Sequence, residues 1–186
     1  HVRSRRQRQM CIRDRCKTGC GIPRHLFILK TGVGEMYQRI VIVGTPGSGK
    51  STLAERIGER LHIPVTHLDQ FAWEDGELMA PHILEQRIVN LVKNEKWICD
   101  GTYSETLELR IKNADLLIWL TDSRWKCILR VLYRYVKSKF SPQIGHNPDI
   151  ISLDFLIYIW NYNKKFEALI NECYAPYRSN CQLWIR

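Results

Sequence analysis

The chain contains no long apolar segment. Its longest hydrophobic runs, such as residues 155–160, are far shorter than the roughly 20 residues that a helix needs to cross a bilayer. The basic stretch at the start is not followed by the apolar core of a cleavable signal peptide. The sequence therefore predicts neither a membrane protein nor a secreted one.

Outside residues 1–35 the chain lacks a strong charge of either sign. Residues 1–35 hold nine Lys or Arg and two Asp or Glu, a net charge of +7, which leaves +2 of the total +9 for all other residues. A surface that binds a nucleic-acid duplex normally carries its positive charge on the folded body. Nucleic acid is therefore an unfavoured partner for residues 36–186.

The cysteines lack the spacing of a common zinc site. Three of them fall within residues 11–20 without a fourth ligand. The others lie in or beside apolar segments and are expected to be small buried side chains in a reducing, cytoplasmic compartment: Cys99, Cys127, Cys173 and Cys181.

Residues 1–35 show no helical or strand period. A basic tail that binds nucleic acid or an anionic surface is one interpretation. We favour another, because QMCIRDR (residues 9–15) is similar to translated adapter sequence: a disordered or artefactual head, with the native start at Met36. The chain ends on an apolar run, so the domain of residues 36–186 is expected to lack a last C-terminal helix.

The strongest motif is a phosphate-binding loop. Residues 44–52 read GTPGSGKST, which matches the P-loop pattern GxxxxGK[ST]. Residues 39–43 predict a buried strand before it, and Leu53, Ile57 and Leu61 recur at helical spacing after it. A strand, a glycine-rich loop and a helix in this order are the context that identifies a P-loop.

Each position of this loop has an expected role with ATP and Mg²⁺. Its glycines permit backbone conformations that turn N–H groups toward an anion. Lys50 is expected to reach the β- and γ-phosphates, Ser51 to ligate Mg²⁺ and Thr52 to reach the α-phosphate. The predicted nucleotide-binding residues are Gly44, Thr45, Pro46, Gly47, Ser48, Gly49, Lys50, Ser51 and Thr52.

Strand and helix patterns alternate along the rest of the chain. Further strands are expected at residues 64–69, 96–100, 115–120 and 181–186, with helices at residues 82–93, 102–112, 123–138 and 151–171. Thr102 and Glu105 are interpreted as a capping box. The alternation predicts an α/β fold with a parallel five-stranded sheet and helices on both faces.

Two acidic residues close predicted strands beside the P-loop strand. Ligands bind at the carboxyl ends of parallel strands. We therefore assign Asp69 as the base that takes a proton from an acceptor hydroxyl, and Asp100 as the acid on the metal side. The alternative is that each acid caps the next segment, which is what we expect of Asp115 and Asp122.

The helix expected at residues 123–138 has a basic and an apolar face. Arg130, Arg134 and Lys137 share one face, just before a loop with the proline and glycine residues of a closing flap. A solvated charged face is an equal alternative for this stripe. The apolar face is expected to point inward: Trp125, Ile128, Leu129, Leu132 and Val136.

Residues 37–186 resemble the small adenylate-kinase-like P-loop proteins known as topology modulation proteins. The matching segments are IVIVGTPGSGKST, HLDQFAW, WICDGTY, LELRIKNADLLIWL and DFLIYIWNYNKK. The resemblance implies a nucleoside-monophosphate-kinase-like fold that binds ATP and Mg²⁺. It also implies that Asp69 acts as the catalytic base, that Asp100 lies near the metal and that Arg110 binds the acceptor. The family's flap usually carries further arginines and a Cys-Pro-Glu segment, whereas this chain reads SKFSPQIGHNPDIISLD.

The sequence thus predicts an ATP-dependent phosphotransferase for a small acceptor with a hydroxyl or a phosphate. Phe71, Trp73 and Tyr103 follow the acidic strand ends and could stack on a planar base, which favours a nucleoside or nucleotide; alternatively they belong to the core. The rival interpretation is an ATP-binding regulator that influences DNA topology. The near-neutral body counts against it, and the sequence does not predict an oligomeric state.

Overall fold

The computed structural model describes residues 37–74, 77–140 and 152–185. The expectations for residues 1–35 and for most of the flap loop fall outside this part of the chain. Within it, no helix is long and apolar enough to cross a membrane.

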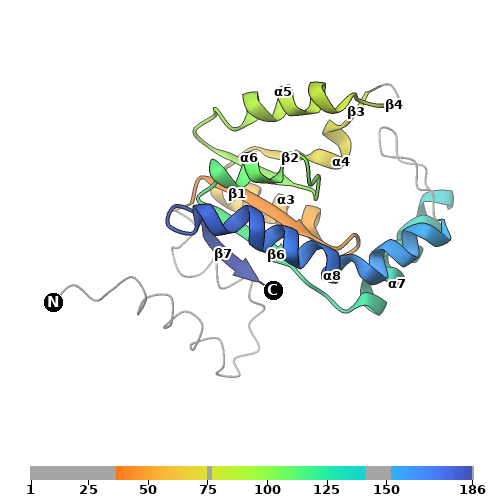
Figure 1. The fold of residues 1–186 in the computed structure, drawn as a ribbon. Coiled ribbons are helices and arrows are strands. Elements are labelled where there is room, and N and C mark those ends of the chain that lie inside the picture. The colour runs from red at the N-terminus through yellow and green to blue at the C-terminus, as the bar shows by residue number, and fades with distance from the viewer. Residues whose placement is uncertain (1–36, 75–76, 141–151, 186) are drawn as a thin grey trace.

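Five parallel strands form the central sheet (Figure 1). Their spatial order is β2-β5-β1-β6-β7, so the P-loop strand β1 lies in the middle, between β5 and β6. The α/β fold with a parallel five-stranded sheet is therefore confirmed. The strands are β1 (Arg39–Gly44), β2 (Val65–His67), β5 (Trp97–Asp100), β6 (Leu116–Leu120) and β7 (Gln182–Ile185).

Helices cover both faces of this sheet, as expected. The side chains of Ile40 and Ile42 pack on one face with helix α3 (Lys50–Leu61). Those of Val41 and Val43 point to the other face, where three helices cover them: α5 (Pro81–Leu91), α6 (Leu107–Lys112) and α8 (Leu153–Tyr174). Central strands that are buried on both faces read as continuous apolar runs, which is why β1 and β6 were recognisable.

Smaller elements complete the described chain. After β2 come the one-turn helix α4 (Leu68–Phe71) and an antiparallel hairpin that the sequence did not predict, β3 (Trp73–Glu74) with β4 (Glu77–Leu78). The 3-10 helix η2 (Ala175–Tyr177) connects α8 to β7. The four cysteines predicted to be free are free, and all except the half-buried Cys173 are buried.

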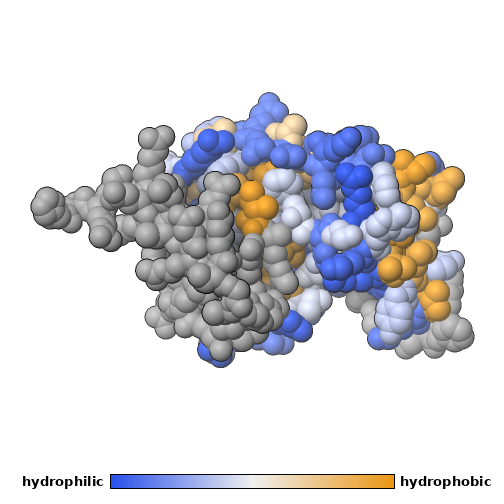
Figure 2. Space-filling model, turned by 90° about the horizontal axis from the view of Figure 1, so that it is seen from below, coloured by the Kyte–Doolittle hydropathy of each residue, from blue (hydrophilic) through white to orange (hydrophobic). Residues whose placement is uncertain are grey.

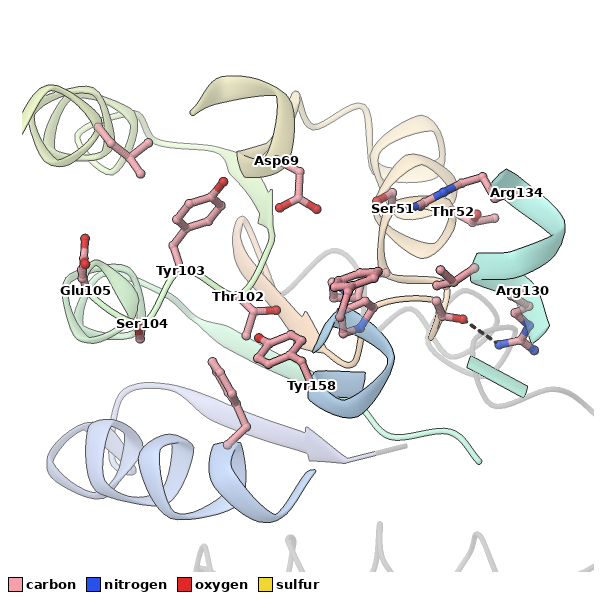
Figure 3. Close-up of a pocket in the computed structure, with 18 of the residues that line it drawn as sticks. Ser51, Thr52, Asp69, Thr102, Tyr103, Ser104, Glu105, Arg130, Arg134 and Tyr158 are labelled. Atoms are coloured by element: carbon pink, nitrogen blue, oxygen red, sulfur yellow. Dashed lines mark hydrogen bonds between the residues drawn. The ribbon is translucent and has the colours of Figure 1, made fainter. Parts of the chain in front are cut away.

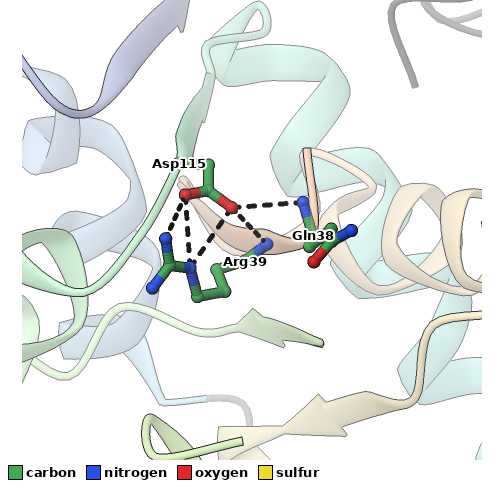
Figure 4. Close-up of polar contacts among 3 residues, drawn as sticks. All are labelled: Gln38, Arg39 and Asp115. Atoms are coloured by element: carbon green, nitrogen blue, oxygen red, sulfur yellow. Dashed lines mark hydrogen bonds and ion pairs between the residues drawn. The ribbon is translucent and has the colours of Figure 1, made fainter. Parts of the chain in front are cut away.

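Asp115 joins the starts of two neighbouring strands instead of capping a helix (Figure 4). Its carboxylate accepts hydrogen bonds from the backbone N–H groups of Gln38 and Arg39. The Arg39 guanidinium lies 2.7 Å from the same carboxylate. This exposed ion pair aligns the first residues of β1 with β6.

The inward face of helix α7 (Arg124–Phe140) was predicted wrongly. Cys127 and Val131 are its buried apolar residues and contact Ile159 of α8. Of the predicted inner residues, Ile128 is partly buried against this cluster, whereas Trp125, Leu129, Leu132 and Val136 are exposed. Figure 2 shows a hydrophobic area at the right of the molecule, the side on which α7 and α8 lie in Figure 1. The helix lies beyond the end of the sheet, against the P-loop and α8, so no sheet face selects its most apolar side.

Two local predictions also fail. Helix α6 starts at Leu107 after Thr106, so Thr102 and Glu105 form no capping box; the Thr102 hydroxyl instead donates to the Gly44 carbonyl at 3.2 Å. Strand β2 ends at His67, and Asp69 lies in helix α4. Strand β5 separates β2 from β1, so Asp100 alone of the two acids closes a neighbour of the P-loop strand.

Candidate active site

A cavity of about 790 Å³ opens beside the P-loop (Figure 3). The P-loop, the start of α3 and helix α7 form one wall. The opposite wall comes from α4, α5 and the segment after β5, and helix α8, which also contacts α7 and the P-loop, lines the cavity between the two walls. The cavity thus lies at the carboxyl end of β1, where ligands bind in open parallel sheets.

The P-loop has the backbone conformation of an anion cradle. Gly47 and Gly49 have φ values of +82° and +91°, in the left-handed region that favours glycine. A Cβ on Gly47 would lie 2.5 Å from the Cys127 carbonyl oxygen of α7, so that position has no room for a side chain. Helix α3 begins directly after the loop, and its N-terminal N–H groups add positive potential for a phosphate.

Lys50 stands at the base of this cradle. Its side chain is 9% exposed, and its ammonium donates to the Thr45 carbonyl at 3.2 Å. Burial lowers the pKa of Lys50, while the charges of Asp69 and Asp100 raise it. A buried cation whose hydrogen bonding is this sparse is well suited to receive an anion.

Three contacts fix the P-loop to the elements around it. The Thr45 hydroxyl donates to Asn163 of α8 at 2.9 Å. The Arg130 guanidinium of α7 donates to the Gly47 carbonyl at 3.2 Å. With the bond from Thr102 to Gly44, these contacts hold the loop in shape before any nucleotide arrives.

Asp69 lines the wall opposite the P-loop, and Figure 3 shows its carboxylate pointing into the cavity toward Ser51. Burial raises the pKa of this carboxyl, and the neighbouring charge of Lys50 opposes that rise. A carboxylate of raised pKa in a cleft is a candidate general base.

Asp100 lies beneath the cavity and does not line it. Its side chain is buried, and it sits 2.8 Å from the Nδ1 atom of His67. His67 also approaches Glu55 of α3, with 3.7 Å between Nε2 and Oε1. The imidazole therefore holds the Asp100 carboxylate in one orientation, a contact between two strand ends that sequence reasoning missed.

Arg130 and Arg134 both line the P-loop wall of the cavity. Besides its bond to Gly47, Arg130 forms an ion pair of 2.7 Å with Asp122. The positive charge of Arg134 acts on Asp69 and on Lys50. Helix α7 thus brings the two predicted arginines to the phosphate side of the cavity.

Arg110 lies away from the cavity. Its side chain is fully buried and donates to the backbone carbonyls of Gly101, Tyr103 and Thr106 at 2.7–3.2 Å. The position expected to bind an acceptor is therefore occupied with holding the segment after β5. That segment carries Tyr103, which does line the cavity.

We expect Arg110→Met to destabilise the fold by on the order of 3 kcal/mol. The shorter apolar chain would leave the carbonyls of Gly101 and Tyr103 without the guanidinium that donates to them, and the Thr106 carbonyl with only the backbone N–H of residue 110. Lys112→Met, an exposed change on the same helix, should alter stability by less than about 0.5 kcal/mol. Urea unfolding of both variants measures the difference, and equal midpoints would contradict the role given to Arg110.

Several cavity residues carried no recognised signal in the sequence. Helix α8 contributes aromatic side chains to the cavity, although the sequence predicted no site residue there. Helix α5 and the residue after β4 contribute apolar side chains. Their spacing of three or four residues is that of any packed helix, so it could not indicate a cavity. The missed lining residues are Met79, Pro81, Leu84, Ser104, Val131, Phe155, Tyr158 and Phe166.

Comparison with known proteins finds the fold and no close relative. No known protein family matches the sequence, and no curated protein does. A shikimate kinase from Acinetobacter baumannii, solved in complex with shikimate, superposes with a TM-score of 0.54 at 17% identity, over 83% of this chain and 86% of the other. This chain has the fold of the P-loop kinases.

A second shikimate kinase, from Bacteroides thetaiotaomicron, gives a TM-score of 0.45 at 16% identity, over 80% of this chain and 85% of the other. The strand order and the position of the P-loop are those of nucleoside-monophosphate-kinase-like proteins. At 16–17% identity, the similarity to these structures shows the fold alone.

Proposed function

We propose that this protein is an ATP-dependent phosphotransferase that phosphorylates a hydroxyl group of a small molecule. One observation carries the proposal. A P-loop lysine and a partly buried carboxylate face the same cavity, and each acts on the pKa of the other. A phosphate donor and a hydroxyl acceptor need these two groups on opposite sides of one space.

Each wall would perform one part of the transfer. The P-loop amides and Lys50 bind the donor's phosphates, and Arg130 and Arg134 neutralise charge that develops on the moving phosphoryl group. Asp69 accepts the proton of the attacking hydroxyl. Tyr103 belongs to the acceptor side, and Arg110 positions the segment that carries it.

Mg²⁺ is the metal this site would use, because the described residues offer hard oxygen ligands and no cluster of three or more potential protein ligands. Bound Mg²⁺ neutralises phosphate charge. Ser51 lines the cavity, and its hydroxyl would bind the ion. Asp100, held below by His67, would act on the waters of the ion.

We expect Asp100→Asn to raise the Mg²⁺ concentration needed for half-maximal rate by roughly tenfold or more. The amide removes the negative charge but keeps the hydrogen-bonding shape beside His67. A magnesium titration of the rate measures the shift. Glu59→Gln, an exposed change on α3, serves as the control and should leave the titration unchanged.

The proposal is tested by incubating the full chain with ATP·Mg²⁺ and candidate acceptors and following ADP release. The competing function, an ATP-binding regulator without an acceptor, predicts ATP binding but no acceptor-dependent ADP release. The resemblance to topology modulation proteins fits either function. The carboxylate in the cavity favours the transferase, since a switch that only binds ATP has no use for a base there.

A further inference from the structure

The charges of the cavity are divided between its two walls. Every Lys or Arg among the described residues that line it stands on the P-loop wall: Lys50, Arg130 and Arg134. The opposite wall, here called the acceptor wall, has polar side chains that are neutral or acidic: Asp69, Thr102, Tyr103, Ser104 and Glu105. Figure 3 shows this separation, with the arginines at one end and Tyr103, Ser104 and Glu105 at the other.

The arginines behind the acceptor wall are directed elsewhere. Arg110 is fully buried and its guanidinium binds three backbone carbonyls. Arg87 of α5 stacks on the ring of Phe71, 5.6 Å from its centroid, and does not line the cavity. In the part of the chain that the structure describes, neither can neutralise an anion on the acceptor.

The Asp69 carboxylate acts on tyrosines that line the cavity on and beside the acceptor wall. The charge of Asp69 raises the pKa of both Tyr103 and Tyr158, after the larger effect of burial on each. Two side chains from different elements therefore experience the same carboxylate. Glu105 adds a second negative charge at the far end of the wall.

We infer that the acceptor is an alcohol that carries no phosphate or carboxylate, so that it is neutral or cationic. This rests on the proposed function and specifies its substrate class. A phosphate or carboxylate placed against this wall would lose hydration with no cation to replace it, and would be repelled by Asp69 and Glu105. A neutral or cationic alcohol would not be repelled by Asp69 and Glu105 and would leave no anionic group without a partner. The aromatic side chains would pack on its carbon skeleton.

Matched acceptor pairs test the inference, each pair sharing a skeleton and differing in one anionic group. Suitable pairs are methyl shikimate with shikimate, adenosine with AMP, and glucosamine with glucosamine 6-phosphate. The full chain is incubated with ATP·Mg²⁺ and each compound, and ADP release is followed after subtraction of the rate of the Lys50→Ala variant. In the most active pair, we expect kcat/KM of the non-anionic member to exceed that of its partner at least tenfold.

The outcomes separate the two proposals. Higher kcat/KM for the anionic member of the most active pair would overturn this inference and leave the phosphotransferase proposal standing. ADP release that no compound of any charge class stimulates would count against the phosphotransferase proposal, and the inference would fall with it. Preference for the non-anionic member supports both.

A pair of variants tests whether the wall sets the preference. Glu105→Gln should narrow the ratio of the two kcat/KM values by roughly two- to fivefold, because it removes an exposed like charge. Glu85→Gln makes the same change at an exposed position of α5 outside the cavity and should leave the ratio unchanged. Equal ratios in both variants would contradict the electrostatic origin of the preference.

Discussion

Replacing Lys50 with alanine is expected to lower the rate of phosphoryl transfer by roughly 10³-fold or more, with the fold intact. The ammonium is the only lysine charge among the described cavity residues, and no other group can take its place at the base of the P-loop. Its hydrogen bond to the Thr45 carbonyl contributes only a small part of the folding free energy. The measurements are acceptor-dependent ADP release and thermal unfolding.

Arg60→Ala is the matched control for this variant. It removes a cation from the last turn of the same helix, far from the loop, and should keep full activity. A Lys50→Ala protein that folds and turns over at the normal rate would remove the basis of the kinase proposal.

Replacing Asp69 with asparagine should lower kcat by roughly 10²–10⁴-fold with little change in ATP affinity. The amide keeps the size and polarity of the side chain but cannot accept the proton of a hydroxyl. Asp154→Asn makes the same chemical change at an exposed position and should be silent. A mild effect of Asp69→Asn, together with a product phosphorylated on a phosphate group of the acceptor, would refute the base assignment. It would indicate a monophosphate kinase.

The pH dependence of Asp69 gives a second readout. A base is active when deprotonated, and burial raises the pKa of this carboxyl. Activity should therefore fall as the pH decreases through that raised pKa, at a higher pH than an ordinary aspartate would produce. The acid limb of kcat/KM should disappear in Asp69→Asn, and its persistence would assign it to another group.

The parts of the site that depend on local sequence could be predicted. The P-loop is one continuous segment whose glycines, lysine and helix start all follow from nine residues. The position of Asp100 at the end of a strand beside β1 was predicted because a short apolar run that ends in an acid indicates a strand end. The central strands were found because burial on both faces makes them continuously apolar.

The parts of the site that depend on contacts between residues distant in sequence could not be predicted. The bonds from His67 to Asp100 and from Thr45 to Asn163 join residues whose types suggest no partner. Arg110 was assigned to the acceptor because of the family resemblance, whereas here its guanidinium donates to backbone carbonyls. The face of α7 was misjudged because its position beyond the sheet was not encoded in its own periodicity.

Gly47 and the Cys127 carbonyl meet with backbone on both sides of the contact. The contacting atom of Cys127 is a backbone oxygen, so shortening its side chain would make no room for a larger residue at position 47. Any larger residue at position 47 would have to displace α7 itself, and with it both arginines of the phosphate wall. The size of the residue at position 47 is therefore limited by the backbone of a helix that follows much later in the chain, so this loop position and α7 could change only together.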